Sequence, residues 1–198
     1  MKNHSVTVFF LSLILSLGIC SQSLAQNSSP TGTIQHMLDS IFEILRAPDF
    51  NLGRDKAAIE EAVDAAFDPN TIAQSALAAS YRDLSTEQRA EFEAIFFQIL
   101  KNTYIDRLGA YTDETTEITG EEVDGNRSTV NSIIYTTNSQ ITLDYSLRQR
   151  PNGWFIYDIV VEDVSLLSSY RSTYRSIIRR SGIDGLMSEL RLQVNGLE

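Results

Sequence analysis

The segment from Trp154 to Tyr174 changes its hydrophobic period midway, and this change constrains the fold more than any other feature of the chain. Up to Val161, apolar residues occupy both alternating faces of an extended chain, which is typical of a strand that is covered on both sides or faces an enclosed cavity. Beyond Val164, apolar residues recur at spacings of three and four, which is typical of one side of a helix. A strand and the helix after it therefore share a hydrophobic core.

Strict alternation in this strand divides its side chains between the two faces of a sheet. On one face it places Phe155, Tyr157, Ile159 and Val161. On the other face it places Trp154, Ile156, Asp158 and Val160. The prediction is therefore that Ile156 and Ile159 lie on opposite faces.

The first 25 residues have the pattern of a secretory signal peptide. Lys2 provides a positive start, residues 6–19 form an apolar run shorter than a membrane span, and Ser23-Leu24-Ala25 is a small-x-small cleavage site. We therefore expect residues 1–25 to be removed and residues 26–198 to form a single domain with a full core. Export of this kind in a bacterium places the protein in the periplasm.

A lipoprotein signal, in which Cys20 is acylated, is the alternative to a cleaved signal peptide. The bulky Ile19 immediately before the cysteine argues against this alternative. Cleavage after Ala25 leaves a mature chain without cysteine, so the core must stabilise an exported protein of this size without a disulfide.

Acidic residues outnumber basic ones, with 26 Asp and Glu against 16 Lys and Arg and a formal net charge of −10. This balance excludes nucleic acid as an expected partner. The expected C-terminal helix nevertheless carries a basic cluster, made of Arg171, Arg175, Arg179 and Arg180. Two interpretations stay open: a solvated helix face, or a contact for lipid phosphate or an acidic partner protein, which suits the fork geometry of guanidinium.

Hydrophobic periodicity predicts four helices in the first half of the mature chain, over residues 33–45, 54–66, 69 onward and 86–108. Asp68 followed by Pro69 is typical of an N-cap with proline at the first helical position. Ser85, with Gln88 at the third position after it, is typical of a capping box.

From Thr115 the hydrophobic pattern changes to a period of two. The turn signals Asp124-Gly125 and Pro151-Asn152-Gly153 help to separate four strands, over residues 115–123, 127–136, 141–148 and 154–161. Strict alternation in the third strand predicts that one face of the sheet is buried. Helices before and after an antiparallel meander predict an α+β fold, in which a sheet of about four to five strands packs on a layer of helices.

Several residue blocks occur in a specific order along the chain. They are Phe67-Asp68, Ile72-Ala73, Leu77, Arg82, Ser85, Gln88-Arg89, Phe92, Phe96, Leu100, Tyr104, Tyr145, Trp154, Tyr157-Asp158, Val164-Ser165 and Tyr170-Arg171. Over nearly the whole mature length, this ordered set resembles the MlaC (toluene-tolerance) family of periplasmic phospholipid-binding proteins.

Four positions depart from the pattern of that family. Tyr81 and Tyr174 stand where the family usually has Trp and Phe, and these exchanges keep the aromatic bulk. Ala78 and Asp163 stand where glycine is usual. Asp163 falls at the corner between strand and helix, where glycine would allow a positive φ, so the substitution puts the shape of this corner in doubt.

The resemblance implies an apolar cavity between sheet and helices that holds acyl chains, with the head group near the mouth. It implies a shuttle that carries glycerophospholipid between an outer-membrane lipoprotein complex and an inner-membrane ABC transporter with its substrate-binding subunit, which maintains outer-membrane lipid asymmetry. A monomer without cofactor or enzymatic activity is expected. The sequence has no G-x-x-x-x-G-K loop, so ATP hydrolysis would belong to a partner.

The resemblance and the apolar stripes together suggest which side chains contact lipid. The candidates are Phe92, Phe96, Leu100, Tyr104, Leu143, Tyr145, Ile156, Val160, Tyr170 and Tyr174. Spacing alone does not decide which of them contact lipid and which fill the core. Arg171 and Arg175 are the candidates for contact with a head group or a partner.

The sequence leaves two alternatives to lipid transport open. A small α+β hydrolase or isomerase would use Asp158 as a desolvated general base, although an ion pair of Asp158 with Arg82 or Arg171 explains the same residue. A chaperone-like protein would have the same composition and no lipid cargo. A metal site has no support, because His36 is the only mature histidine and is expected at the surface.

Overall fold

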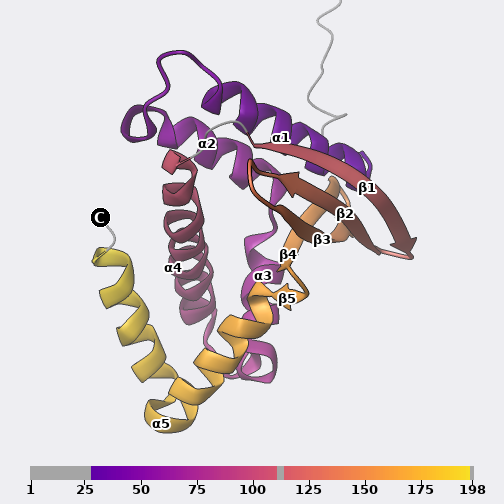
Figure 1. Cartoon of the computed structure of the whole chain (residues 1–198). Helices are drawn as coiled ribbons and strands as arrows, with labels where there is room; N and C mark the ends of the chain where they lie inside the picture. The colour runs from indigo at the N-terminus through magenta and orange to yellow at the C-terminus, as the bar shows by residue number, and fades with distance from the viewer. Residues whose placement is uncertain (1–27, 111–113, 197–198) are drawn as a thin grey trace, which may run out of the picture.

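The computed structural model describes residues 28–110 and 114–196, so the predicted signal peptide and Cys20 lie outside the described residues. The helices are α1 (Pro30–Leu45), α2 (Leu52–Ala66), α3 (Pro69–Leu77), η2 (Ala78–Asp83), α4 (Thr86–Ile105), η3 (Asp106–Ala110) and α5 (Leu166–Asn195). The strands are β1 (Thr115–Asp124), β2 (Arg127–Tyr135), β3 (Gln140–Arg150), β4 (Gly153–Val161) and β5 (Val164–Ser165). Figure 1 shows α1 and α2 together against the sheet, and α4 and α5 in a second group beside it.

The five strands form one antiparallel sheet in the order β1-β2-β3-β4-β5, which confirms the predicted meander and α+β class. Hairpins join neighbouring strands, and Gly125 in the first of them has a φ of 58°. The turn at Pro151-Asn152 joins Arg150 to its partner Gly153. A meander of this kind leaves one face free for the helices to cover.

A β-bulge in β4 overturns the expectation of strict alternation. Ser146 pairs with Asp158 and Leu147 pairs with Ile156, so Tyr157 is an extra residue without a partner on β3. Beyond the bulge, Ile159 pairs with Tyr145, which lies on the same face as Leu147. The bulge therefore brings Ile156 and Ile159 to the same face of the sheet.

The helix caps expected from the sequence are present. The Asp68 carboxylate accepts a hydrogen bond of 3.0 Å from the backbone N–H of Thr71 at the start of α3. In the capping box of α4, the Ser85 hydroxyl accepts from the Gln88 N–H at 3.2 Å, and the Gln88 side chain accepts from the Ser85 N–H at 3.0 Å. These caps satisfy N–H groups that have no partner within the helix and so define where α3 and α4 begin.

The corner between β4 and β5 has positive φ angles without glycine. Glu162 and Asp163 have φ values of 48° and 64°, and they form the two-residue loop between Val161 and Val164. Two successive positive φ angles are the signature of a type I′ hairpin turn, and aspartate adopts them more readily than most residues. The corner therefore has a positive φ at Asp163, the conformation for which a glycine was expected.

Helix α5 consists of two segments that meet at Gly182. This residue has φ 71° and ψ −177°, which is not helical, and Figure 1 shows the chain turning back there. The returning segment packs beside α4, where Arg191 contacts Glu91 at 2.6 Å. Because of this bend, both segments of α5 pack against α4.

The buried apolar residues form two clusters. The first joins α3, α4 and α5, with Phe92, Phe96 and Leu190 among its members. The second joins α1, α2 and the sheet, with Ile34 and Leu147 among its members. Val63 and Phe67, which are only partly buried, pack against both clusters. The space between the two clusters is where a cavity is found.

Candidate functional site

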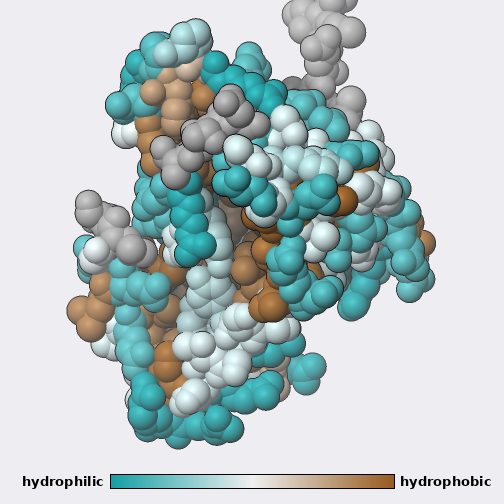
Figure 2. Space-filling view, viewed as in Figure 1, coloured by the Kyte–Doolittle hydropathy of each residue, from teal (hydrophilic) through white to brown (hydrophobic). Residues whose placement is uncertain are grey.

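An apolar cavity of about 370 Å³ lies between the sheet and the helices. This volume falls within the range of about 300–1,000 Å³ that is usual for small-molecule sites. In Figure 2, apolar residues are visible in a recess between α4 and the sheet. The only charged residues in its lining are Lys101 and Asp158.

Helix α4 and η3 provide one wall of the cavity. The lining residues of this wall recur at helical spacing and are Phe97, Leu100, Lys101, Tyr104, Ile105 and Leu108. The opposite wall is the inner face of the sheet, to which β3 contributes Leu143 and Tyr145 and β4 contributes Ile159 and Val161. Because the bulge at Tyr157 precedes Ile159, it decides that Ile159 and Val161 face the cavity and not the other side of the sheet.

The charge of Lys101 is directed away from the cavity. Its ammonium group lies 2.9 Å from Asp64 and 3.6 Å from Glu60, both on α2. It also lies 5.4 Å from the centre of the Phe97 ring. The aliphatic part of Lys101 can therefore serve as cavity wall while α2 neutralises its charge.

Asp158 connects the end of β4 to the start of α5. Its carboxylate accepts hydrogen bonds from the N–H of Ile159 at 2.9 Å, the N–H of Leu167 at 3.1 Å and the hydroxyl of Ser165 at 2.5 Å. Among the described residues it has no ion pair, so the expected pairing with an arginine is not observed. These hydrogen bonds give Asp158 a structural role that does not require a catalytic one.

The structure separates the ten predicted lipid contacts into two groups. Four line the cavity, namely Leu100, Tyr104, Leu143 and Tyr145. The other six are not in its lining, namely Phe92, Phe96, Ile156, Val160, Tyr170 and Tyr174. Val160 pairs with Asp144 and so lies on the sheet face opposite to Tyr145, while Ile156 is fully buried in the cluster of α1, α2 and the sheet.

The aromatic members of the second group pack against one another between α4 and α5. The Phe96 ring centre lies 5.1 Å from that of Tyr170 and 5.3 Å from that of Tyr174, and both pairs meet edge to face. Phe92 stacks on Phe96 at 5.4 Å. Their side chains fill the interface between these two helices.

Several cavity residues were not among the candidates from the sequence. They include Met37, Ile41, Phe67, Phe97, Ile159 and Val161. The apolar stripe of α1 contained the signal for Met37 and Ile41, but nothing in the sequence indicated that this stripe faces the sheet across a space. Val161 was assigned to a face by strict alternation, which the bulge interrupts.

Arg171 and Arg175 lie away from the cavity. With the end of α3, they border a separate hollow of about 90 Å³. The Arg171 Nε–H donates to the carbonyl of Ser75 at 2.8 Å, which ties α5 to the C-terminal turn of α3. Arg175 is exposed and faces solvent.

Burial keeps the hydroxyl groups of the inner tyrosines protonated. It raises the pKa of Tyr145 to about 12, against the opposing effect of Ser132. Burial, with a contribution from the neighbouring Tyr104, raises the pKa of Tyr170 to about 12, and burial also raises the pKa of Tyr174. Of these three residues only Tyr145 lines the cavity, where a neutral hydroxyl group suits an apolar ligand.

The described residues contain no group of three or more His, Cys, Asp or Glu side chains that could hold a metal ion, and His36 is exposed on α1. None of the helices in this part of the chain combines the length and apolar character that a membrane crossing requires. An antiparallel sheet and helices that enclose an apolar cavity define a binding protein for an apolar ligand.

The comparison with known proteins narrows this class. The family model described as MlaC protein matches residues 35–192, and the chain belongs to this family. It is 23% identical over 190 residues to the intermembrane phospholipid transport system binding protein MlaC of Haemophilus influenzae, across 91% of this chain and 89% of that protein. The resemblance seen in the sequence is thereby confirmed.

A solved structure has the same fold. The phospholipid-binding protein from Ralstonia solanacearum, in complex with a phospholipid, superposes with a TM-score of 0.76 and 23% sequence identity. The match covers 87% of this chain and 98% of that one. The α+β architecture described above is therefore shared with a relative that holds phospholipid.

Proposed function

We propose that the protein is a periplasmic carrier that binds glycerophospholipid through its acyl chains and passes it between an outer-membrane lipoprotein complex and an inner-membrane ABC transporter. The observation that supports this most directly is the apolar cavity between the sheet and α4. The relatives named above support the choice of phospholipid as the ligand.

The free energy of lipid transfer explains why a carrier is needed. Each buried methylene group is worth roughly 0.8 kcal/mol against water. Two acyl chains of about 16 carbons therefore represent on the order of 20 kcal/mol or more, so free diffusion of the lipid through water is negligible. A protein cavity that covers acyl chain lowers this barrier in proportion to the methylene groups that it buries.

The composition of the cavity suits exchange with a bilayer. Its walls and the membrane interior are both hydrocarbon-like, so moving a chain between them is close to neutral in free energy. A polar group left unpaired in the wall would impose a cost, and both charged lining residues have partners: Lys101 on α2 and Asp158 at the start of α5. Direction must then come from docking or from ATP hydrolysis by the transporter.

The basic side of α5 is a candidate for docking to these partners. Arg175 and Arg179 are exposed on it, and the chain as a whole is acidic. An acidic surface on a partner would be attracted to this helix and repelled elsewhere. We propose Arg175 as a partner contact, and Arg171 as the residue that ties this helix to α3.

The decisive experiment is the lipid content of native protein. The chain should be expressed with its own N-terminal segment, purified from the periplasm, extracted with organic solvent and measured by mass spectrometry. We expect close to one phospholipid per chain, with an unrelated periplasmic protein of similar size as the control. Recovery of no more glycerolipid than from the control would contradict the proposal and favour a protein without lipid cargo.

A further inference from the structure

The rim of the cavity contains a cationic residue, Arg107, that has no role in the proposed function as described above. Arg107 lies in η3, three residues after Tyr104 and directly before Leu108, and both of these residues line the cavity. Arg107 itself is exposed. Its guanidinium therefore lies where the apolar wall meets the solvent.

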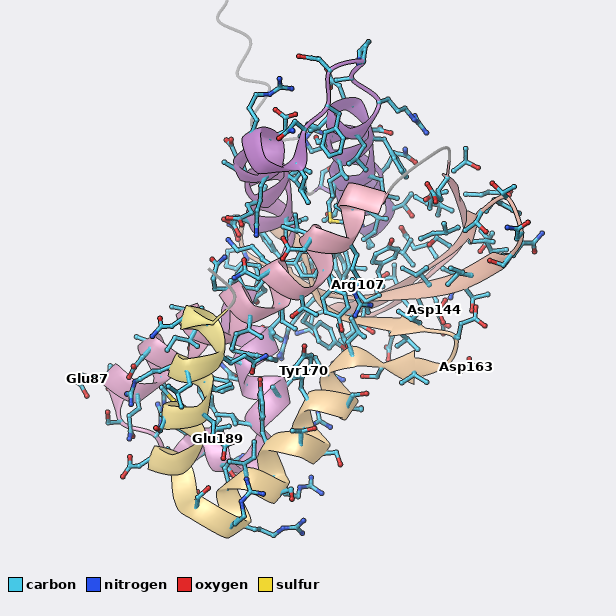
Figure 3. The ribbon with its side chains drawn as sticks, turned by 60° about the vertical axis from the view of Figure 1, so that its left-hand side comes forward. Glu87, Arg107, Asp144, Asp163, Tyr170 and Glu189 are labelled. Carbon is cyan, nitrogen blue, oxygen red and sulfur yellow. The ribbon has the colours of Figure 1, made fainter. Side chains whose placement is uncertain are left out.

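A contact with Tyr104 keeps the Arg107 side chain at the rim. The guanidinium carbon lies 5.4 Å from the centre of the Tyr104 ring, in a cation–π arrangement. Tyr170, at the start of α5, is near enough for Arg107 to act on the pKa of its hydroxyl, in opposition to burial. Figure 3 shows Arg107 and Tyr170 on the same side of the molecule, near the end of α4 and the start of α5.

The charge of Arg107 is not neutralised by the described carboxylates. No ion pair joins Arg107 to an acidic side chain within residues 28–108 or 114–196. The adjacent Asp106 is held by Lys56 on α2 at 2.9 Å. The other cation of this wall, Lys101, is paired with Asp64. Arg107 is thus a cation at the rim with its hydrogen-bond donors open to an anion.

We propose that Arg107 binds the phosphate group of the lipid whose acyl chains occupy the cavity. This inference rests on the proposed function. A guanidinium can donate two parallel N–H bonds to a phosphate, and the position of Arg107 beside Tyr104 and Leu108 puts this anion site next to the apolar wall. Arg107 therefore selects phosphorylated lipids over neutral lipids with the same chains.

The test compares two lipids that differ only in the head group. Binding of phosphatidylglycerol and of diacylglycerol with identical chains should be measured for the full chain emptied of its native lipid. A charge-assisted hydrogen bond at an exposed site is worth about tenfold in affinity. We expect Arg107→Gln to weaken phosphatidylglycerol binding about tenfold and to leave diacylglycerol binding unchanged, with an intermediate loss for Arg107→Lys.

The control variant is Arg127→Gln, which makes the same change of charge. Arg127 is exposed at the tip of the β1–β2 hairpin, at the far end of the sheet from α4 in Figure 1. The head-group preference of the Arg127→Gln variant should equal that of the wild-type protein. An equal loss of preference in both variants would mean that net charge and not the Arg107 site is responsible, and would overturn the inference.

The remaining outcomes are also decisive. An unchanged head-group preference in Arg107→Gln, or an equal loss of affinity for both lipids, would show that Arg107 does not bind the phosphate. Glycerol 3-phosphate, which has the phosphate and no chains, should not displace lipid at about 1 mM; displacement would assign the site to a free phosphate ester. A wild-type protein that binds neither lipid would reject the proposed function, and this inference with it.

Discussion

Arg150 on β3 lies 2.7 Å from Asp68, the residue that caps α3, so an ion pair joins the end of a central strand to the start of a helix. The same guanidinium donates to the hydroxyl of Thr71, which in turn donates to Asp68 at 2.6 Å. Asp68 also donates its backbone N–H to the carbonyl of Ile156 on β4 at 2.9 Å. This network fixes α3, which contributes Ile72 to the cavity lining, to the sheet.

Removal of this ion pair should make the protein less stable in a way that depends on pH. Burial alone would raise the pKa of Asp68, but hydrogen bonds from Thr71 and Arg150 outweigh it and hold the pKa below its ordinary value of 3.8. Arg150→Gln should lower the free energy of unfolding at neutral pH by about 1–2 kcal/mol.

The pKa of Asp68 is lower in the folded state than in the unfolded state. The contribution of Asp68 to the free energy of unfolding is therefore complete at pH values above its unfolded-state pKa, and it is lost as the pH falls through its folded-state pKa. The difference between wild type and Arg150→Gln should therefore shrink at low pH. Urea unfolding at neutral pH and at about pH 3 measures both quantities. A difference that stays constant between these pH values would argue against a charged Asp68 as the partner.

The β-bulge at Tyr157 decides which of two neighbouring valines faces the cavity, so the same substitution should act differently at the two positions. Val161 faces the cavity, whereas Val160 lies on the opposite face of β4. Val161→Trp should fill part of the cavity and reduce bound lipid several-fold, while Val160→Trp should leave the lipid content near the wild-type level. Lipid extraction and circular dichroism of both variants would check loading and folding; equal loading of both would disprove the assignment of faces.

Ala78 should be a site where glycine is stabilising. It ends α3 with φ 50° and ψ −120°, a conformation that an L-residue with a Cβ atom rarely adopts. Ala78→Gly removes this strain and should raise the free energy of unfolding by about 1 kcal/mol. Ala79→Gly, at an exposed neighbour without a positive φ, should be neutral or destabilising. Thermal unfolding of the two variants distinguishes the release of backbone strain at Ala78 from a general effect of introducing glycine.

Gly182 should tolerate neither alanine nor asparagine. A Cβ atom there would meet nothing within 4 Å, so the only penalty is the backbone conformation of φ 71° and ψ −177°. This region of φ/ψ space is almost restricted to glycine, and it differs from the left-handed helical region that asparagine adopts readily. Both variants should lose about 1–3 kcal/mol, measured by urea unfolding. A clear rescue by asparagine would mean that the bend has a different backbone conformation.

Local signals in the sequence were sufficient to predict most elements. Asp68 with Pro69 and Ser85 with Gln88 predicted where α3 and α4 begin, because a cap depends on residues within one turn. The alternation in β3 predicted its buried face correctly, since Tyr145 and Leu147 are both buried. Predictions of this kind depend only on residues that are close to one another in the sequence.

The face assignments in β4 and the cavity walls needed information that the sequence does not contain. Strict alternation failed at Tyr157, because a bulge is a relation between two strands and leaves no reliable mark on one of them. In the sequence, the stripe of Phe92 and Phe96 is indistinguishable from a cavity wall, but in the structure Tyr170 and Tyr174 of α5 cover it. Helical spacing shows that residues share a face, but not what lies opposite.

The division of the hydrophobic interior into two clusters has a consequence for calorimetry. The cavity between them is bordered by members of both, such as Phe97 from one and Met37 from the other, so a bound chain would touch both halves and add its binding free energy to that of folding. The midpoint of thermal unfolding would then report occupancy: a preparation carrying mixed cargo would melt over a broad range, and one stripped of cargo would melt at a single lower temperature.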